Sequence, residues 1–216
     1  MIAPPPIVNL ISGVILAGGR GYRLGGTGKA LQMLAGRPLV AHVAARLAPQ
    51  LPADRLMLNA NGSVEQFVQF ALPVFADDVA GQPGPLAGIL AAIRSTDKSV
   101  AWVFSAPTDT PFLPSDLVAR LAADAQTGGV EIVLAASSGG LCQVCGLWST
   151  SLEHDLAAAL ASGRNKVLAF VERHRWRQVE FQSIEVGVET VDPFFNINTP
   201  EDLAIATGLL SSAQTS

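Results

Sequence analysis

Residues 14–29 read VILAGGRGYRLGGTGK, an apolar segment that runs directly into a loop with six glycines. Glycine lacks a Cβ and tolerates positive φ, so such a loop can bring backbone N–H groups against phosphate oxygens. Arg23 and Lys29 add positive charge where a polyphosphate would lie. A glycine loop after a first buried strand is usually a ligand site, although a plain surface loop is the alternative. We therefore predict a phosphate site here, with Arg23 and Lys29 beside the phosphates.

Two familiar phosphate loops do not fit this stretch. A Walker A loop that ends at Lys29 needs glycine at position 23 and Ser or Thr at position 30, where the chain has Arg23 and Ala30. A dinucleotide fingerprint that starts at Gly19 needs its third glycine where the chain has Leu24. The sequence therefore argues against a P-loop NTPase and against a dehydrogenase.

Short β-branched segments alternate with Ala- and Leu-rich segments of helical period along the rest of the chain. We expect strands at residues 12–17, 55–59, 73–76, 100–105, 131–136, 143–148 and 177–181. We expect helices at residues 38–48, 62–70, 86–95, 114–125, 151–161, 165–173 and 200–209. The alternation predicts a three-layer α/β/α, Rossmann-like domain with a mostly parallel sheet. With 216 residues, we expect one such domain over residues 1–216, with an ordered core at about residues 8–210.

Composition excludes several classes of protein. The net charge is 14 − 18 = −4, so no global positive field is available to hold nucleic acid. Residues 132–152 are uncharged and long enough to cross a bilayer, but a Ser-Ser-Gly-Gly turn interrupts them and indicates two strands instead. No basic segment precedes the apolar residues 8–17, as a signal peptide would require. We expect a cytoplasmic protein without nucleic-acid or membrane partners.

The glycine loop fits the pattern L-A-G-G-x-x-x-R-x-G-x-x-x-K. The residues that match are Leu16, Ala17, Gly18, Gly19, Arg23, Gly25 and Lys29. This pattern resembles the nucleotidyltransferases that activate sugar phosphates, polyols or pterins with a nucleoside triphosphate. Between about Ser12 and Leu203 the chain resembles, within that superfamily, the molybdenum cofactor guanylyltransferase (MobA-type) family. The supporting segments are Asn59-Ala60-Asn61, Asp77, PGPLAG at 83–88, Asp109-Thr110-Pro111 and NINTPEDL at 196–203.

The resemblance implies a fold, a reaction in which Lys29 and Arg23 act as catalytic residues, and partners. The reaction is Mg²⁺-dependent transfer of GMP from GTP to the phosphate of a molybdopterin-type cofactor, with release of pyrophosphate. Transient contact with molybdenum insertion proteins or recipient molybdoenzymes is implied as well. Two alternatives stay open: a cytidylyltransferase of the same superfamily, and a non-catalytic adaptor that binds nucleotide or cofactor. The departures that keep the adaptor open are Gly28, where many relatives have an acidic residue, and Cys142-Gln143, where relatives often have His-Pro.

Asp109 follows the strand expected at residues 100–105, at the carboxyl edge where open α/β sheets gather ligands. A carboxylate there can hold Mg²⁺, which bridges triphosphate oxygens. Alone, Asp109 is equally well explained as a turn residue beside Pro111. The resemblance favours the metal, so Asp109 is expected to act in catalysis and to bind both nucleotide and Mg²⁺.

Asn59 and Asp77 each follow an expected strand, and the resemblance places both among the nucleotide contacts. Guanine presents two adjacent donors, N1–H and the 2-amino group, which amide or carboxylate oxygens can accept. Without the resemblance, Asn59 would be a turn residue before Gly62, and Asp77 with Asp78 a solvated acidic pair. The nucleotide-binding residues that the resemblance implies are Leu16, Ala17, Gly18, Gly19, Lys29, Asn59, Asp77, Gly88 and Asp109.

Asn196 and Asn198 are two residues apart and share a face if the backbone is extended. The resemblance places them near the active site, on the pterin side. Thr199 and Asp202 have the spacing of an N-cap and N3 pair, which accounts for a helix start but not for the two asparagines.

Cys142 and Cys145 form a C-x-x-C motif, which can indicate zinc or redox chemistry. Residues three apart in a strand point to opposite faces, and no second Cys or His pair completes a zinc site. We therefore expect structural cysteines in a reducing compartment.

Overall fold

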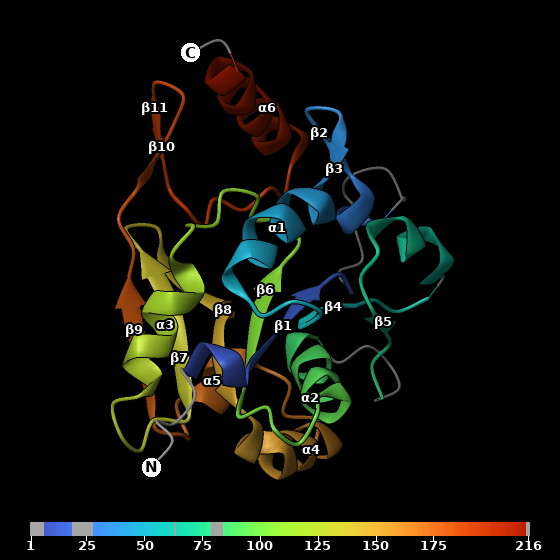
Figure 1. Ribbon diagram of the computed structural model, residues 1–216, viewed down its shortest axis with the longest axis vertical. Helices are drawn as coiled ribbons and strands as arrows, with labels where there is room; N and C mark the ends of the chain where they lie inside the picture. Colours follow the sequence, from blue (N-terminus) through green and yellow to red (C-terminus); the bar gives the residue numbers. More distant parts are fainter. Residues whose placement is uncertain (1–6, 19–27, 63, 79–83, 215–216) are drawn as a thin grey trace.

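The central sheet is mostly parallel in this computed structural model, which describes residues 7–18, 28–62, 64–78 and 84–214. Within these residues seven strands pair in the order β5-β4-β1-β6-β8-β7-β9 (Figure 1). Their bounds are β1 (Ile11–Leu16), β4 (Leu56–Asn59), β5 (Val74–Phe75), β6 (Trp102–Pro107), β7 (Ile132–Ser137), β8 (Gly140–Ser149) and β9 (Trp176–Glu180). Only β8 runs antiparallel to its neighbours, β6 and β7. The predicted mostly parallel α/β sheet is confirmed.

Helices cover both faces of this sheet, which confirms the three layers. Their bounds are α1 (Leu39–Leu47), α2 (Pro85–Ser95), α3 (Leu117–Ala125), α4 (Glu153–Ala161), α5 (Val167–Val171) and α6 (Pro200–Gln214). The strands alternate between two apolar cores: Ile11 and Ile15 of β1 pack with α1 and α3, whereas Val14 packs with α2, α4 and α5. This is the period of two expected of a strand that is buried on both faces.

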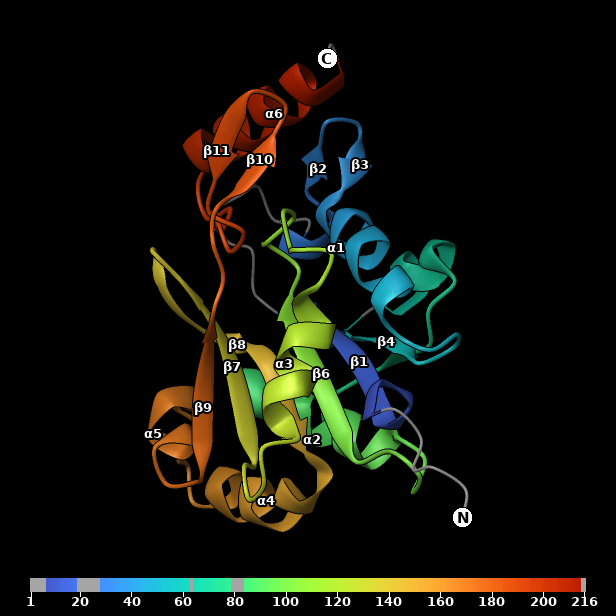
Figure 2. The ribbon, with the colours of Figure 1, turned by 60° about the vertical axis from the view of Figure 1, so that its left-hand side comes forward.

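A third apolar cluster lies beyond the carboxyl edge of the sheet. It joins α6 to two small hairpins, which Figure 2 shows above the sheet. Their strands are β2 (Met33–Leu34), β3 (Arg37–Pro38), β10 (Ile184–Val186) and β11 (Glu189–Val191). The sequence did not predict these strands, because two or three residues are too few to show an alternating pattern.

One of the predicted helices is a 3₁₀-helix and not an α-helix. Residues 62–70 were expected to form an α-helix, but the segment Val64–Phe70 is a 3₁₀-helix, η4. Its apolar residues Val64, Phe67 and Phe70 recur every third position, which matches three residues per turn. The rings of Phe67 and Phe70 lie 6.3 Å apart between centroids.

At the other end of the chain, the predicted helix at 200–209 continues as α6 to Gln214. No helix in the part of the chain that the structure describes combines the length and apolarity needed to cross a bilayer.

The expectation that Cys142 and Cys145 point to opposite faces is wrong. The β7–β8 register shifts between Leu134 and Ala135, which marks a β-bulge in β8. Both cysteines therefore pack against the same apolar core, the one beneath α1 and α3. Gly146 ends the irregular stretch, and a Cβ there would lie 2.4 Å from the Val133 carbonyl oxygen. Within the described residues no three or more Cys, His, Asp or Glu side chains group as a metal site.

Candidate functional site

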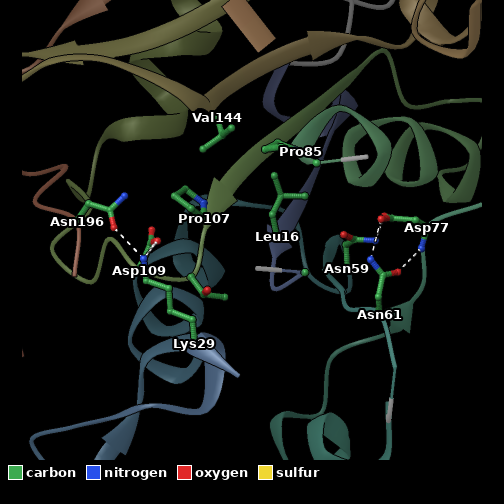
Figure 3. Close-up of a pocket in the computed structure, with 13 residues that line it drawn as sticks. Leu16, Lys29, Asn59, Asn61, Asp77, Pro85, Pro107, Asp109, Val144 and Asn196 are labelled. Carbon is green, nitrogen blue, oxygen red and sulfur yellow. Dashed lines mark hydrogen bonds and ion pairs between the residues drawn. The ribbon is translucent and has the colours of Figure 1, made fainter. Parts of the chain in front are cut away.

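The main cavity, about 420 Å³ in volume, opens at the carboxyl edge of β1, β4 and β6. It is lined by Leu16, Gly18, Lys29, Asn59, Asn61, Asp77, Gly84, Pro85, Pro107, Thr108, Asp109, Val144 and Asn196. Figure 3 shows two polar groups on opposite sides of it, with Leu16 between them. Six of the residues predicted from the sequence to bind nucleotide therefore lie around one cavity: Leu16, Gly18, Lys29, Asn59, Asp77 and Asp109.

The first polar group centres on Lys29, the first residue of the 3₁₀-helix η2 (Lys29–Leu31). Its ammonium Nζ lies 2.5 Å from Asp109 Oδ2, and these side chains are only 16% and 13% exposed. Nζ also donates to Asn198 Oδ1 at 2.6 Å and to Asn196 Oδ1 at 3.3 Å. An ammonium has three donors, so all three are engaged here.

One carboxylate oxygen of Asp109 differs from the other in its surroundings. Its Oδ1 is buried and has no hydrogen-bond partner among the described residues. Such a carboxylate oxygen is costly to leave unpaired unless a ligand completes it. The described residues bring no group of three or more Cys, His, Asp or Glu side chains together around it. A cation held by Asp109 would therefore take its remaining ligands from a bound substrate and from water, as Mg²⁺ commonly does.

The backbone around Asn196 and Asn198 is fixed by two sets of hydrogen bonds. Ile197, between the two asparagines, donates its N–H to the Asp109 carbonyl at 2.9 Å. The Asp202 carboxylate accepts from the N–H groups of Asn198 and Thr199, each at 2.9 Å, while Thr199 Oγ1 accepts from Asp202 N. These backbone hydrogen bonds lower the pKa of Asp202. The expected helix start is confirmed as a reciprocal cap, and it leaves both asparagine side chains directed at Lys29.

The second polar group consists of Asn59, Asn61 and Asp77, which come from the ends of β4 and β5. Asp77 Oδ1 accepts from Asn59 Nδ2 at 2.9 Å, and Asp77 Oδ2 accepts from Asn61 Nδ2 at 2.7 Å. The Asp77 N–H donates to Asn61 Oδ1 at 2.9 Å. The carboxylate thus fixes the orientation of both amides. Each of its oxygens retains a second lone pair for a ligand.

Asn61 is a cavity residue that we did not single out from the sequence. A signal for it was present, because Asn59 and Asn61 have the same Asn-x-Asn spacing as Asn196 and Asn198. Residues two apart in extended backbone share a face, so Asn61 had to lie on the side of Asn59.

The remaining predicted residues lie at the margins of the cavity or outside the described residues. The Ala17 N–H donates to the Asn59 carbonyl at 2.8 Å, which continues the β1–β4 pairing past the end of β1. Gly88 of α2 lies behind Asn59, where a Cβ would come within 2.5 Å of Asn59 Oδ1. Gly19 and Arg23 lie outside the residues that the structure describes.

A side cavity of about 280 Å³ adjoins the main cavity and shares Pro107, Val144 and Asn196 with it. Its other lining residues come from the β7–β8 turn, from the bulge and from the segment after β11: Ser137, Gly139, Gly140, Leu141, Cys142, Gln143, Asp192 and Phe194. Asp192 ties these segments together. Its carboxylate accepts from Ser137 Oγ at 2.7 Å and from the N–H groups of Gly139 at 3.1 Å and Phe194 at 2.8 Å.

Known proteins resemble this chain in sequence and in fold. The chain is 48% identical over 197 residues to a molybdenum cofactor guanylyltransferase of Rhodopseudomonas palustris (strain BisB5), covering 89% of this chain and 90% of that protein. A protein of the same name from Bradyrhizobium sp. (strain ORS 278) is 44% identical over 200 residues, or 91% of each chain. The fold is similar to that of molybdopterin-guanine dinucleotide biosynthesis protein A from Archaeoglobus fulgidus, with a TM-score of 0.74 at 23% identity over 93% of this chain and 98% of that one. Residues 13–179 match the family model described as the MobA-like NTP transferase domain, so the chain belongs to that family.

Proposed function

We propose that the protein is a molybdenum cofactor guanylyltransferase, which transfers GMP from GTP to the phosphate of a molybdopterin-type cofactor and releases pyrophosphate. The curated relatives of that name, at 48% and 44% identity, support this activity. The structural observation that carries the proposal is the division of one cavity between the Lys29–Asp109 pair and the Asn59–Asn61–Asp77 group. Such a division suits a nucleotide whose phosphates and base need different chemistry.

The base end is assigned to the Asn59–Asn61–Asp77 group. Guanine offers the adjacent N1–H and 2-amino donors, and the Asp77 oxygens and Asn59 Oδ1 are acceptors held in fixed orientation. Asn59 is only 3% exposed, so its polar atoms are largely removed from water. A site of this kind discriminates strongly, since a base without the matching donors leaves buried acceptors unpaired.

The phosphate end is assigned to Lys29; the sequence motif assigns the glycine loop and Arg23 to the same phosphates. The reaction forms a bond between an acceptor phosphate oxygen and the α-phosphorus of GTP and breaks the bond from that phosphorus to the β-phosphate oxygen. Negative charge then develops on the leaving pyrophosphate. The half-buried Lys29 ammonium offsets that charge in a partly dehydrated site. Positioning and electrostatics account for such catalysis without a covalent enzyme intermediate.

Magnesium is proposed as the metal, with Asp109 Oδ1 as its protein ligand. The fit rests on that oxygen, which is buried and has no partner in the described part of the chain, while Oδ2 pairs with Lys29. A divalent cation bound there would neutralise charge on the triphosphate oxygens.

The acceptor is assigned to the side cavity, because that cavity opens from the main one at Asn196. Asn196 and Asn198 then lie on the pterin side of Lys29. Transient partners for delivery are proposed to be molybdenum insertion proteins or recipient molybdoenzymes. The proposed compartment is the cytoplasm, where the two free cysteines remain reduced.

The test is a base-competition assay. The protein, a molybdopterin-type cofactor and Mg²⁺ are mixed with equal concentrations of GTP, CTP, ATP or UTP, and pyrophosphate is followed. GTP should dominate by orders of magnitude, and ITP, which lacks the 2-amino group, should be clearly poorer than GTP. Preference for CTP would replace the guanylyltransferase by a cytidylyltransferase. No pyrophosphate from any triphosphate would replace the enzyme by an adaptor.

A further inference from the structure

The bulge in β8 brings the two cysteines of the chain together. In an extended strand, residues three apart are separated by roughly 10 Å, whereas a disulfide needs Cα atoms within about 7 Å. Here Cys142 lies opposite Ala135 and Gly146 lies opposite Leu134. Two neighbouring residues of β7, 134 and 135, therefore face residues of β8 that are four positions apart, 146 and 142. The backbone between them is therefore not regularly extended, and both cysteine side chains pack against the same apolar core on one side of the sheet.

The two thiols differ in access to solvent. Cys145 is fully buried at 0% exposure, while Cys142 is partly exposed and lines the side cavity. A hydrogen bond from the Cys145 thiol lowers the pKa of Cys142, whereas burial raises the pKa of Cys145. The accessible sulfur is thus the better nucleophile, and the inner, protonated sulfur packs in the same apolar core against which Cys142 lies. This is the arrangement of an oxidisable cysteine beside a resolving cysteine.

We propose that Cys142 and Cys145 form a reversible redox pair, in which a peroxide oxidises Cys142 and Cys145 then closes an intramolecular disulfide in the wall of the side cavity. In the first step the Cys142 sulfur attacks the peroxide, so that an S–O bond forms, the O–O bond breaks and one water leaves. In the second step the Cys145 sulfur attacks the Cys142 sulfur, the S–O bond breaks and a second water leaves with the Cys145 proton. Two thiols lose two electrons and the peroxide gains them. A small dithiol reverses the bridge by exchange.

The bridge would alter the proposed acceptor site more than the nucleotide site. Cys142 and Gln143 line only the side cavity, whereas Val144 lines both cavities and is held by Ser105 Oγ, which donates to the Val144 carbonyl at 2.7 Å. Drawing Cys142 toward the buried Cys145 therefore moves the acceptor wall first. We expect the KM for the acceptor to rise on oxidation by a larger factor than the KM for GTP. This consequence rests on the proposed function, whereas formation of the bridge does not.

The first test measures the bridge without any activity. The reduced protein is treated with hydrogen peroxide, and its intact mass, free-thiol content and non-reducing peptide map are recorded. We expect loss of two hydrogen atoms, loss of both titratable thiols, a Cys142–Cys145 cross-linked peptide and recovery of both thiols with dithiothreitol. Because the chain has only two cysteines, no other intramolecular pairing can give this result. Unreacted thiols, a disulfide-linked dimer, or sulfinic and sulfonic acid at Cys142 without a bridge would overturn the proposal.

Two variants test the order of the steps. In Cys145→Ser the resolving thiol is missing, so peroxide should leave a sulfenic acid at Cys142 that dimedone traps. In Cys142→Ser the buried Cys145 should stay reduced at the same peroxide concentration. Equal peroxide reactivity of the two variants would contradict the assigned roles. The peptide map of the wild-type protein decides the existence of the bridge even where a variant fails to fold.

The kinetic test compares the acceptor KM and the GTP KM of reduced and oxidised wild-type protein in the pyrophosphate assay. Cys142→Ser is treated with peroxide in the same way, and its rates are compared with those of the untreated variant. A bridge that forms but leaves the acceptor KM unchanged would refute its effect on the acceptor site. Absence of turnover with every triphosphate would refute the proposed function and leave the mass result standing.

Discussion

Gly88→Ala tests the assignment of the Asn59 side of the main cavity. Gly88 lies inside α2, where alanine is preferred to glycine by about 1 kcal/mol, so the helix backbone does not oppose the change. The side chains do oppose it. An added Cβ would lie 2.5 Å from Asn59 Oδ1 and 2.7 Å from Leu16 Cδ2, closer than side-chain atoms tolerate. Asn59, Leu16 or both must therefore move.

The expected magnitude follows from these contacts. Overpacking a filled site costs about 1–3 kcal/mol, and the helix gain of about 1 kcal/mol offsets part of it. The net loss of about 0–2 kcal/mol lowers the Tm by at most about 8 °C in a chain of this size. Moving Asn59 also disturbs its 2.9 Å hydrogen bond to Asp77. If the base loses one such contact, about 1–2 kcal/mol of nucleotide binding disappears, and the KM for GTP rises about 5- to 30-fold.

The assay is steady-state pyrophosphate release with GTP varied and the acceptor saturating. Gly208→Ala is the matched control, since Gly208 lies inside α6 and an added Cβ there meets nothing within 4 Å. The control should keep the wild-type KM and gain about 2–4 °C in Tm from the same helix preference. A folded Gly88→Ala protein whose KM for GTP equals that of wild type would refute the placement of the base beside Asn59.

Four further substitutions examine the rest of the site. Lys29→Ala should lower kcat/KM at least about tenfold, which corresponds to about 1.4 kcal/mol; the exposed Lys98→Ala is its control, and wild-type kinetics together with a wild-type Tm would contradict the phosphate assignment. Asp109→Asn should raise the Mg²⁺ concentration for half-maximal rate, because an amide oxygen is a poorer ligand for a hard cation; superimposable metal titrations would place the metal elsewhere. Asp192→Ala should raise the acceptor KM more than the GTP KM, because Asp192 holds the wall of the side cavity. Asp192→Asn keeps one acceptor oxygen and should restore part of the loss. Equal changes in both KM values would show that Asp192 only stabilises the fold. Asn196→Ala should leave the GTP KM nearly unchanged and raise the acceptor KM, and the reverse pattern in the same assay would assign Asn196 to the nucleotide.

The sequence predicts the residues at strand ends well, for a topological reason. In a parallel sheet the carboxyl ends of β1, β4 and β6 meet at one edge, so polar residues that follow different strands converge there without any knowledge of side-chain contacts. Leu16, Asn59 and Asp109 lie at or just after the ends of such strands; the family resemblance implied their role in binding nucleotide, and all three line the main cavity. The helix start at Thr199 and Asp202 was also predictable, because its hydrogen bonds are local.

Features that depend on distant pairing were not predictable. The contact from Lys29 to Asn198 joins residues 169 positions apart, and no local pattern encodes it. The β8 bulge is another case, since a spacing of three residues in a regular strand implied opposite faces for the two cysteines, and only the register against β7 reverses that. Gly146 accommodates the bulge because it has no Cβ to meet the Val133 carbonyl oxygen. The need for glycine there can be recognised only once the position of Val133 is known.

Lys29 provides a physical link between the two cavities. Its three donors are all engaged in the free protein, so an arriving triphosphate can bind the ammonium only by displacing one of the present acceptors. The weakest is Asn196 Oδ1, at 3.3 Å and without charge, whereas Asp109 is ionic and Asn198 lies at 2.6 Å. Asn196 also lines the side cavity. Displacement by the nucleotide would therefore release the Asn196 amide oxygen at the entrance to the proposed acceptor site. This order favours nucleotide binding before acceptor binding. It also explains why Asn196→Ala is expected to raise the acceptor KM and to leave the GTP KM nearly unchanged.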